Sequence, residues 1–277
     1  MTPDEYCQQK AVASGSSFYY SFLFLPAERR RAITALYAFC REVDDVVDET
    51  AEPQIAAAKL GWWRSEIANL FAGNPQHPVT KALLPFLARF SISREKLSDI
   101  IDGMEMDLTQ TRYLDWTGLE RYCYRVAGVV GLLAAGIFGY RDARTLENAR
   151  ELGIAFQLTN IIRDVGEDAR KNRIYLPMAD LKEFGVPAAD ILQSRETPEF
   201  GRLMTFEAAR ARSHYEKAMQ ALPDGDRKPQ RPGLIMAAIY RTLLEEIERD
   251  GFHVLTQRTS LTPLRKFWIA WKTWVGG

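Results

Sequence analysis

The stretch "AITALYAFCREVDDVVDET", residues 32–50, decides the fold class, because it joins an apolar helical pattern directly to a cluster of acids. At about 100° per residue, one narrow stripe of a helix carries four polar side chains, those of Tyr37, Arg41, Asp44 and Asp48. Asp45 lies about 80° away from this stripe. Carboxylates at i and i+4 repel each other, so we expect a partner beside Asp44 and Asp48 that compensates for this repulsion.

The same helical pattern continues through the chain. Apolar residues recur at spacings of three and four, and strand-like alternation is scarce. We therefore expect an all-α fold, formed as a single helical domain over residues 1–277. Breaks between helices are expected at the turn-forming segments "LPAE", "GNPQHP", "FSIS", "GYRDA", "FGVPAAD" and "LPDGDRKPQRPG".

Composition excludes several classes of function. The 277 residues include 36 Lys plus Arg and 36 Asp plus Glu, so there is no global field to recruit nucleic acid. The cysteines Cys7, Cys40 and Cys123 are widely spaced, which favours reduced thiols over disulfides. The three histidines are scattered without ligand spacing, which argues against a zinc site.

A second stretch, "FQLTNIIRDVGED" at residues 156–168, repeats the design of the first. Its polar residues Gln157, Asn160, Asp164 and Asp168 cover an arc of about 80° on an otherwise apolar helix. Two helices with such acid pairs could face each other across a cavity. Carboxylate oxygens are the ligands that Mg²⁺ prefers, together with waters and substrate phosphates.

Basic residues accompany both acid stripes. Arg41 lies on the first, and Arg163, Arg170, Lys171 and Arg173 surround the second. Metal and Arg/Lys groups that clamp a diphosphate would stabilise it as a leaving group. The reaction expected is ionisation of an allylic diphosphate to a carbocation in a dry, aromatic pocket. Solvated helix faces, or a non-catalytic helical protein that binds metal or a basic partner, are the alternatives.

Four motifs together resemble the squalene/phytoene synthase family. They are "DDVVD" at 44–48, "RDVGED" at 163–168, "SGSSFYYSFLFLP" upstream and "YCYRVAGVVG" between them. The resemblance covers nearly the whole chain. It implies an isoprenoid synthase fold around a central cavity and a prenyltransferase dependent on Mg²⁺, with Mn²⁺ as the alternative metal.

Within the family, the phrase "ASGSSFYYSFLFLPAERRRAITALYAFCREVDDVVDE" most resembles the bacterial enzymes that make presqualene diphosphate for hopanoid biosynthesis. This resemblance implies 1'-1 coupling of two farnesyl diphosphates with release of diphosphate, no use of NADPH, and downstream isoprenoid enzymes as partners. Phytoene synthase, which uses geranylgeranyl diphosphate, and a full squalene synthase, which uses NADPH, remain alternatives.

The resemblance also implies roles for individual residues. The metal site would comprise Asp44, Asp48, Asn160, Asp164 and Asp168. Substrate contacts would come from Ser17, Arg41, Gln157, Asn160, Arg163, Tyr240 and Arg258. The catalytic groups would be Tyr122, Tyr37, Arg41 and Tyr175, and the small residues Ala127 and Gly131 would let a substrate tail pass close to the backbone.

The C-terminal stretch "LRKFWIAWKTWVGG" carries Trp268, Trp271 and Trp274 among basic residues. This pattern is typical of a helix at a membrane interface, although tryptophans docked on the core would give the same spacing. Residues 265–277 are therefore candidates for peripheral membrane contact. The first ten residues lack the pattern of a signal peptide, so we expect a cytoplasmic protein that contacts the inner face of the membrane.

Overall fold

The computed structural model describes residues 1–13, 21–22, 25–50 and 52–276, and within these ranges the chain is helical and forms no strand. The prediction of an all-α fold is confirmed. The elements are α1 (Pro3–Ala13), α3 (Ala27–Glu49), α4 (Pro53–Phe71), α5 (Pro78–Leu83), the 3₁₀ turn η1 (Leu84–Phe86), α6 (Arg94–Thr109), α7 (Trp116–Cys123), the π-helix η2 (Tyr124–Gly128), α8 (Val129–Phe138), α9 (Arg144–Arg170), α10 (Met178–Phe184), α11 (Ala188–Leu192), α12 (Pro198–Ala221), the 3₁₀ turn η3 (Asp224–Asp226), α13 (Arg231–Arg249) and α14 (Pro263–Gly276).

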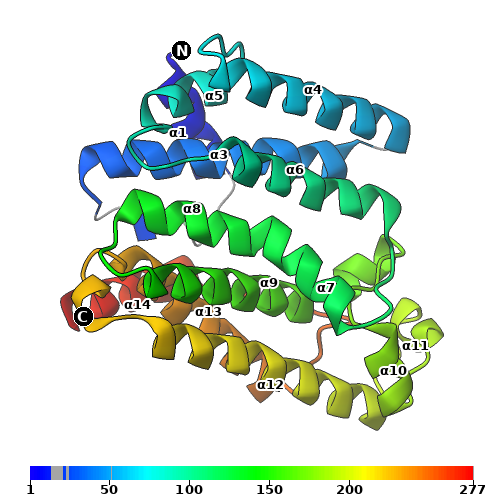
Figure 1. Ribbon diagram of the computed structural model, residues 1–277. Coiled ribbons are helices and arrows are strands. Elements are labelled where there is room, and N and C mark those ends of the chain that lie inside the picture. Colours follow the sequence, from blue (N-terminus) through cyan, green and yellow to red (C-terminus); the bar gives the residue numbers. More distant parts are fainter. Residues whose placement is uncertain (14–20, 23–24, 51, 277) are drawn as a thin grey trace.

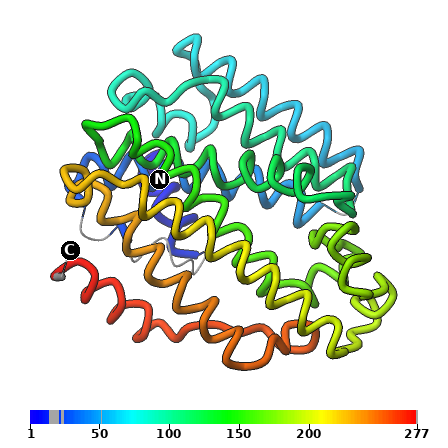
Figure 2. The backbone as a smooth tube through the Cα atoms, turned by 60° about the horizontal axis from the view of Figure 1, so that its bottom comes forward, coloured from blue at the N-terminus to red at the C-terminus, as the bar shows by residue number. Residues whose placement is uncertain are grey.

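The helices stack in layers, with α4 at one end of the stack, α12 at the other, and α3, α6, α8 and α9 between them (Figure 1). Two hydrophobic clusters fill the spaces between layers. One joins α3, α4, α6 and α8, and the other joins α7, α9, α12 and α13. Helix α14 lies along α13 on the outside of the molecule (Figure 2). The middle of the stack, between α3, α8, α9 and α13, is where the central cavity forms.

Helix α3 shows why this sequence folds as it does. Its apolar residues Leu36, Phe39 and Val43 are fully buried, and each such side chain stabilises the fold by about 1.5–3 kcal/mol. The acids that follow them continue the same helix to Glu49. Burial of the apolar face therefore holds the acid stripe in place.

Helices α7 and α8 continue into each other through the π-helix η2. A Cβ at Gly131 would collide with the Ala149 carbonyl oxygen, and a Cβ at Gly153 with the Ala127 carbonyl oxygen. Glycine at these two positions therefore lets α8 and η2 approach the backbone of α9. π-Helical turns are often found at functional sites, and this one begins two residues after Tyr122.

One helical stretch, Trp116–Phe138, is long and apolar enough to cross a membrane by length and composition. In the structure it packs between α6 and α9 and lines the central cavity. This location is the one expected for a core helix.

Three segments near the cavity, residues 110–115, 171–177 and 250–262, were not predicted as breaks. Residues 110–115 and 171–177 separate helices, and an isolated parallel β-bridge joins Arg112 to Ile174. The amide of Ile174 donates to the Thr111 carbonyl (3.0 Å), and that of Met178 to the Tyr113 carbonyl (2.8 Å). This pairing fixes Tyr175 next to the end of α6.

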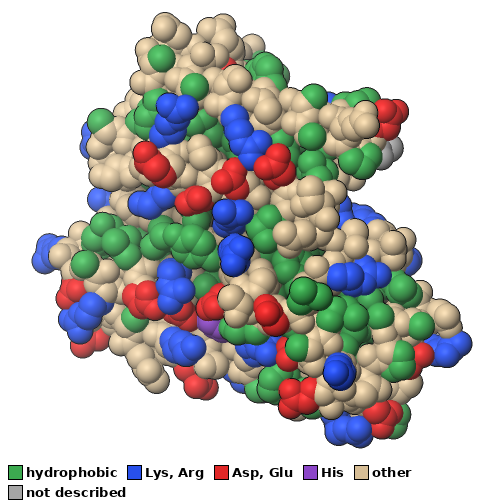
Figure 3. Space-filling view, turned by 45° about the vertical axis from the view of Figure 1, so that its right-hand side comes forward, with side chains coloured by type: hydrophobic (Ala, Val, Ile, Leu, Met, Phe, Trp, Pro, Cys, Tyr) green, Lys and Arg blue, Asp and Glu red, His purple; other side chains and the backbone are tan. Residues whose placement is uncertain are grey.

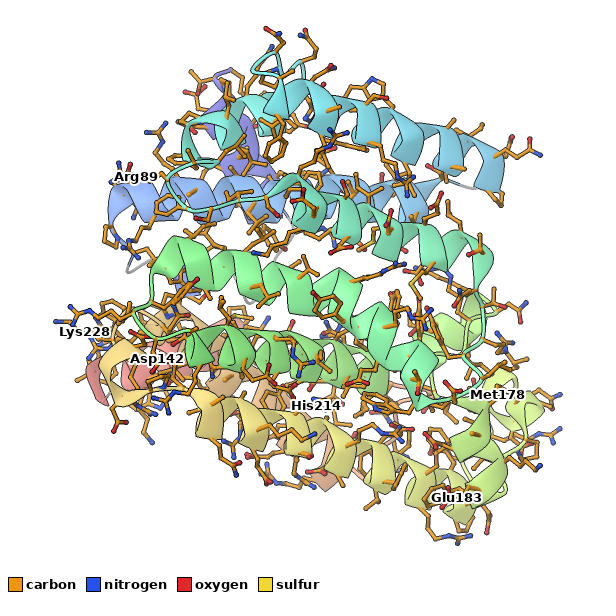
Figure 4. The ribbon with its side chains drawn as sticks, viewed as in Figure 1. Arg89, Asp142, Met178, Glu183, His214 and Lys228 are labelled. Atoms are coloured by element: carbon orange, nitrogen blue, oxygen red, sulfur yellow. The ribbon has the colours of Figure 1, made fainter. Side chains whose placement is uncertain are left out.

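Polar side chains between α9 and α12 are paired. His214 lies between these two helices in Figure 4 and its Nδ1 is 2.6 Å from the Glu151 carboxylate. Thr159 and Tyr215 share a hydrogen bond of 2.9 Å. His214 therefore contributes to the packing of α9 against α12.

On the face shown in Figure 3, acidic and basic side chains are intermixed. This distribution agrees with the equal numbers of 36 acidic and 36 basic residues, and that face offers no large patch of one sign. The cysteines Cys7, Cys40 and Cys123 are free, as predicted.

Candidate active site

Residues of both acid stripes line one cavity, which we call the polar cavity. Its walls come from α3, α6, α7 and α9 and from the segments that follow α9 and α13. The lining charged and amide side chains include Arg41, Asp44, Asp48, Asp107, Gln157, Asn160, Arg163, Asp164, Glu167, Asp168, Lys171, Arg173 and Arg258, together with the phenols of Tyr122 and Tyr175.

The α3 wall carries Asp44 and Asp48. The Asp44 carboxylate accepts a hydrogen bond of 2.6 Å from Arg41. The Asp48 carboxylate lies 3.6 Å from the Lys171 ammonium and 3.7 Å from the Arg173 guanidinium. Cations from α3 itself and from the segment after α9 therefore face this pair.

Asp45 lies on a different side of α3, as the helical spacing predicts. It pairs with Lys10 of α1 at 2.8 Å, and it also accepts from Arg41 at 2.6 Å. Its side chain does not line the polar cavity in the part of the chain that the structure describes. Arg41 thus links the cavity to the outer side of the helix.

The α9 wall carries Asp164 and Asp168. Asp164 accepts hydrogen bonds of 2.8 Å from Nε of Arg163 and of 2.8 Å from Nε of Arg258, and Arg163 adds a second bond. Arg258 also lies 3.2 Å from Glu167. Asp168 has no ion pair with any residue in the described ranges. The two acids of this stripe therefore differ in their environment.

The pKa values follow these environments. Burial raises the pKa of Asp168 to about 7, and the neighbouring Asp164 carboxylate adds to the effect. Burial also raises the pKa of Asp44 to about 6, against the attraction of Arg41. At Asp164 burial is outweighed by Arg163 and Arg258, so the pKa is lowered. Burial thus favours the protonated form of both Asp44 and Asp168.

The cavity residues fit a divalent cation. The Asn160 Oδ1 atom is buried and accepts no hydrogen bond from any described residue. An unpartnered amide oxygen beside several carboxylates is the set of hard oxygen donors that Mg²⁺ prefers. Among the described residues, however, no three acidic, His or Cys side chains form a ready-made metal cluster. Instead, Arg41, Lys171 and Arg173 neutralise part of the negative charge of Asp44 and Asp48.

Asp107 of α6 was missed by the sequence analysis. It is 8% exposed and accepts hydrogen bonds from the hydroxyls of Tyr122 (2.9 Å) and Tyr175 (2.8 Å), whose rings stack at 5.2 Å. A signal was present, because Asp107 lies on the apolar stripe of its helix with Ile100 and Met104. An acid on such a buried stripe needs partners, and here two phenols supply them.

An apolar cavity adjoins the polar one, and Gln157 and Asn160 line both. Its walls are mostly aliphatic and aromatic, with Tyr37 among them. Ala127 and Gly131 line it as well, although close helix packing already requires glycine at Gly131. The remaining lining residues include Phe22, Ile33, Leu36, Cys40, Val126, Val130, Ala134, Phe138, Leu152, Phe156, Pro232, Gly233 and Met236.

The remaining predicted residues are placed as follows. Tyr240 of α13 is 7% exposed, and its ring lies 4.9 Å from that of Phe156. It hydrogen-bonds Asn160, so it lies behind the junction of the two cavities. Arg170 is exposed and does not line the polar cavity, because it lies on the outer side of α9. Ser17 lies outside the described residues.

Comparison with known proteins agrees with this geometry. The family model for squalene/phytoene synthase matches residues 11–265. A phytoene synthase of Arthrospira platensis is 38% identical over 95% of this chain and 89% of its own length, and one of Zea mays is 37% identical over 95% of this chain and 62% of its own.

Two solved structures are similar over most of the chain. A dehydrosqualene synthase superposes with a TM-score of 0.87 at 28% identity, covering 98% of this chain and 95% of that one. The squalene synthase HpnC from Alicyclobacillus acidocaldarius gives 0.81 at 29% identity, covering 90% and 94%. The predicted isoprenoid synthase fold is confirmed. This chain belongs to the squalene/phytoene synthase family.

Proposed function

We propose that the chain couples two farnesyl diphosphates in a 1'-1 reaction that depends on Mg²⁺, with presqualene diphosphate as product and diphosphate released. The observation that carries the proposal is the junction at Gln157 and Asn160, where a cavity of acids and cations adjoins an apolar cavity. A prenyl diphosphate has the same division into a charged head and a hydrocarbon tail. Membership of a prenyltransferase family supports it.

The charged residues would bind and orient the diphosphate. Arg41, Arg163 and Arg258 now bond to aspartates, and a diphosphate would compete for the same guanidinium groups. Mg²⁺ held by Asp44, Asp48, Asn160, Asp164 and Asp168 would neutralise charge on the departing diphosphate. The bound metal would then supply positive charge to Asp168, whose pKa is raised to about 7 by burial and, to a lesser extent, by the neighbouring Asp164 carboxylate.

The apolar cavity would control the carbocation. When the C1–O bond of the first substrate breaks, diphosphate leaves with the electron pair and an allylic cation remains. The double bond of the second substrate attacks C1, and ring closure with loss of a proton gives the cyclopropane. Tyr122 and Tyr175, which line the polar cavity and are fixed by Asp107, would present aromatic groups to the cation from the diphosphate side. The aliphatic walls of the apolar cavity would exclude water.

The test is incubation of the purified chain with Mg²⁺ and farnesyl or geranylgeranyl diphosphate, with and without NADPH, followed by mass spectrometry. The proposal expects a thirty-carbon cyclopropyl diphosphate from farnesyl diphosphate, whether or not NADPH is present. If squalene forms, and only when NADPH is present, the chain is a full squalene synthase and the proposed product is wrong. The absence of any coupled product from either substrate would overturn the proposal.

A second candidate is phytoene synthase activity. The curated relatives of 37% and 38% identity are phytoene synthases, and this similarity favours geranylgeranyl diphosphate as the substrate. The same incubation separates the two, because a phytoene synthase would give a forty-carbon hydrocarbon and would use farnesyl diphosphate poorly.

Adjacent residues of α3 provide a matched test of the metal role. Asp48→Asn is expected to lower turnover by about 10²-fold or more, with unchanged helical content by circular dichroism. Glu49→Gln is the control, because Glu49 is exposed and does not line the polar cavity. Equal activity of the two variants would remove Asp48 from the proposed metal site.

A further inference from the structure

Helix α14 exposes a continuous apolar stripe. At about 100° per residue its members span about 100° of the helix surface. Trp268 and Trp271 stack within it, with ring centroids 5.2 Å apart. The stripe comprises Leu264 (83% exposed), Phe267 (49%), Trp268 (58%), Trp271 (44%) and Val275 (65%).

The opposite face of α14 packs on the protein. Ala270 is fully buried, and Ile269 and Trp274 pack against the hydrophobic cluster formed with α13. Of the three tryptophans in the C-terminal motif, two therefore point outward and one points inward. Core packing explains Trp274 only, so the exposed stripe has another cause.

Basic side chains border the stripe. Lys272 and Arg265 lie about 80° and 100° from Leu264 around the helix, and α14 contains no acidic residue. Lys272 is exposed, while Arg265 forms an ion pair of 2.5 Å with Glu246 of α13. Lys228, in the segment before α13, projects at the end of the molecule where α14 ends (Figure 4). Cations beside an apolar aromatic stripe complement a surface of anionic headgroups.

A second copy of the chain fits this face less well than a bilayer. A symmetric dimer across α14 would pair two basic helices, because α14 carries Arg and Lys but no acid. Exposed Trp and Phe side chains with cations at their edge instead match the boundary between headgroups and acyl chains.

The position of α14 relative to the cavity adds an independent observation. The Arg231 guanidinium lies 5.2 Å from the ring centroid of Trp274, near the end of α14. Pro232 and Gly233, the next residues after Arg231, line the apolar cavity. The end of α14 therefore lies next to the α13 turn that closes one side of this cavity.

We propose that the exposed stripe of α14 binds the surface of a lipid bilayer that contains anionic headgroups, and that this contact sets the apolar cavity beside the membrane. The proposed membrane-binding face depends only on the exposed residues of α14. The relation to the cavity rests on the proposed function, since long prenyl chains partition into a bilayer. Membrane contact through α14 would shorten the path of these chains between the bilayer and the site.

The test is co-sedimentation of the full chain with vesicles of phosphatidylcholine, alone or mixed with phosphatidylglycerol. We expect binding to mixed vesicles that weakens as salt is raised. The double variant Trp268→Ala/Trp271→Ala should lower the partition constant about tenfold or more. Lys272→Glu should weaken binding to mixed vesicles and leave the weaker binding to pure phosphatidylcholine unchanged.

The matched control is Trp62→Ala, because Trp62 is 48% exposed on α4, on the other side of the molecule (Figure 1). Its vesicle binding should equal that of the wild type. Turnover of detergent-dispersed substrate should be the same in all variants, which separates this proposal from the proposed function. Unchanged vesicle binding by the Trp268→Ala/Trp271→Ala variant would overturn the proposal. So would a wild-type chain that binds no vesicles but sediments as a dimer that this variant dissociates.

Discussion

Asp107 provides the sharpest test of how the site works. Replacing it with Asn preserves its shape but removes the charge and one of the two acceptor oxygens that the hydroxyls of Tyr122 and Tyr175 now use, at 2.9 and 2.8 Å. At least one phenol must then lose its acceptor. Because Asp107 is only 8% exposed, water cannot readily replace the lost partner.

The expected magnitude follows from one such bond. A hydrogen bond to a charged group contributes about 1.5–3 kcal/mol. If the bond holds a phenol in its reactive position throughout the reaction, its loss lowers turnover by about 10- to 150-fold. The folded state should not suffer in parallel, because burial raises the pKa of Asp107 to about 6. A neutral Asn avoids the cost of burying that charge.

The assay measures diphosphate release and coupled product, with thermal unfolding followed by circular dichroism. Asp107→Asn should lose activity while its melting temperature stays equal or rises. Asp99→Asn, on the same helix but outside the polar cavity, should behave as the wild type. In a Tyr122→Phe/Tyr175→Phe background, Asp107→Asn should lower turnover little further, because the hydroxyl groups through which Asp107 acts are absent. An equal loss in both backgrounds would refute the reasoning.

Three further outcomes are expected. Burial raises the pKa of Glu207 from 4.5 to about 7, so the folded state binds this proton more tightly than the unfolded chain does. The free energy of unfolding should therefore fall by about 2–3 kcal/mol between pH 5 and pH 8. Urea unfolding of Glu207→Gln should not show this fall. Gly153→Ala should lower the free energy of unfolding by about 1–3 kcal/mol, because its Cβ would meet the Ala127 carbonyl oxygen. Gly61→Ala, which has open space around it, should raise the free energy of unfolding by about 0.5–1 kcal/mol. Burial raises the pKa of Asp168 to about 7, and a proton there competes with metal, so the rise in melting temperature on adding Mg²⁺ should be larger at pH 8 than at pH 6.

The acid stripes were predictable because helical geometry is local. Asp44 and Asp48, and Asp164 and Asp168, lie one helical turn apart, so spacing alone assigns each pair to one face. The same rule separated Asp45, which pairs with Lys10 on the other side of α3. Family resemblance then indicated that the two faces belong to one site.

Tyr175 illustrates what helical spacing does not determine. Its resemblance to a family position marked it as a candidate, but its bond to Asp107 depends on the bridge between Arg112 and Ile174. Asp107 itself was overlooked for the complementary reason. Its place on an apolar stripe was readable, yet neither phenol partner lies near it in the sequence.

By itself, the sequence determined the helical class, the acid faces and the family, because each depends on residues within a few turns of one another or on contiguous motifs. Tertiary structure decided which cations neutralise which acids, as when Arg258 reaches Asp164. It also decided that Gln157 and Asn160 stand where the two cavities meet, and that Trp274 packs inward while Trp268 remains exposed. These features depend on how distant helices pack, and the period of a single helix carries no information about its neighbours.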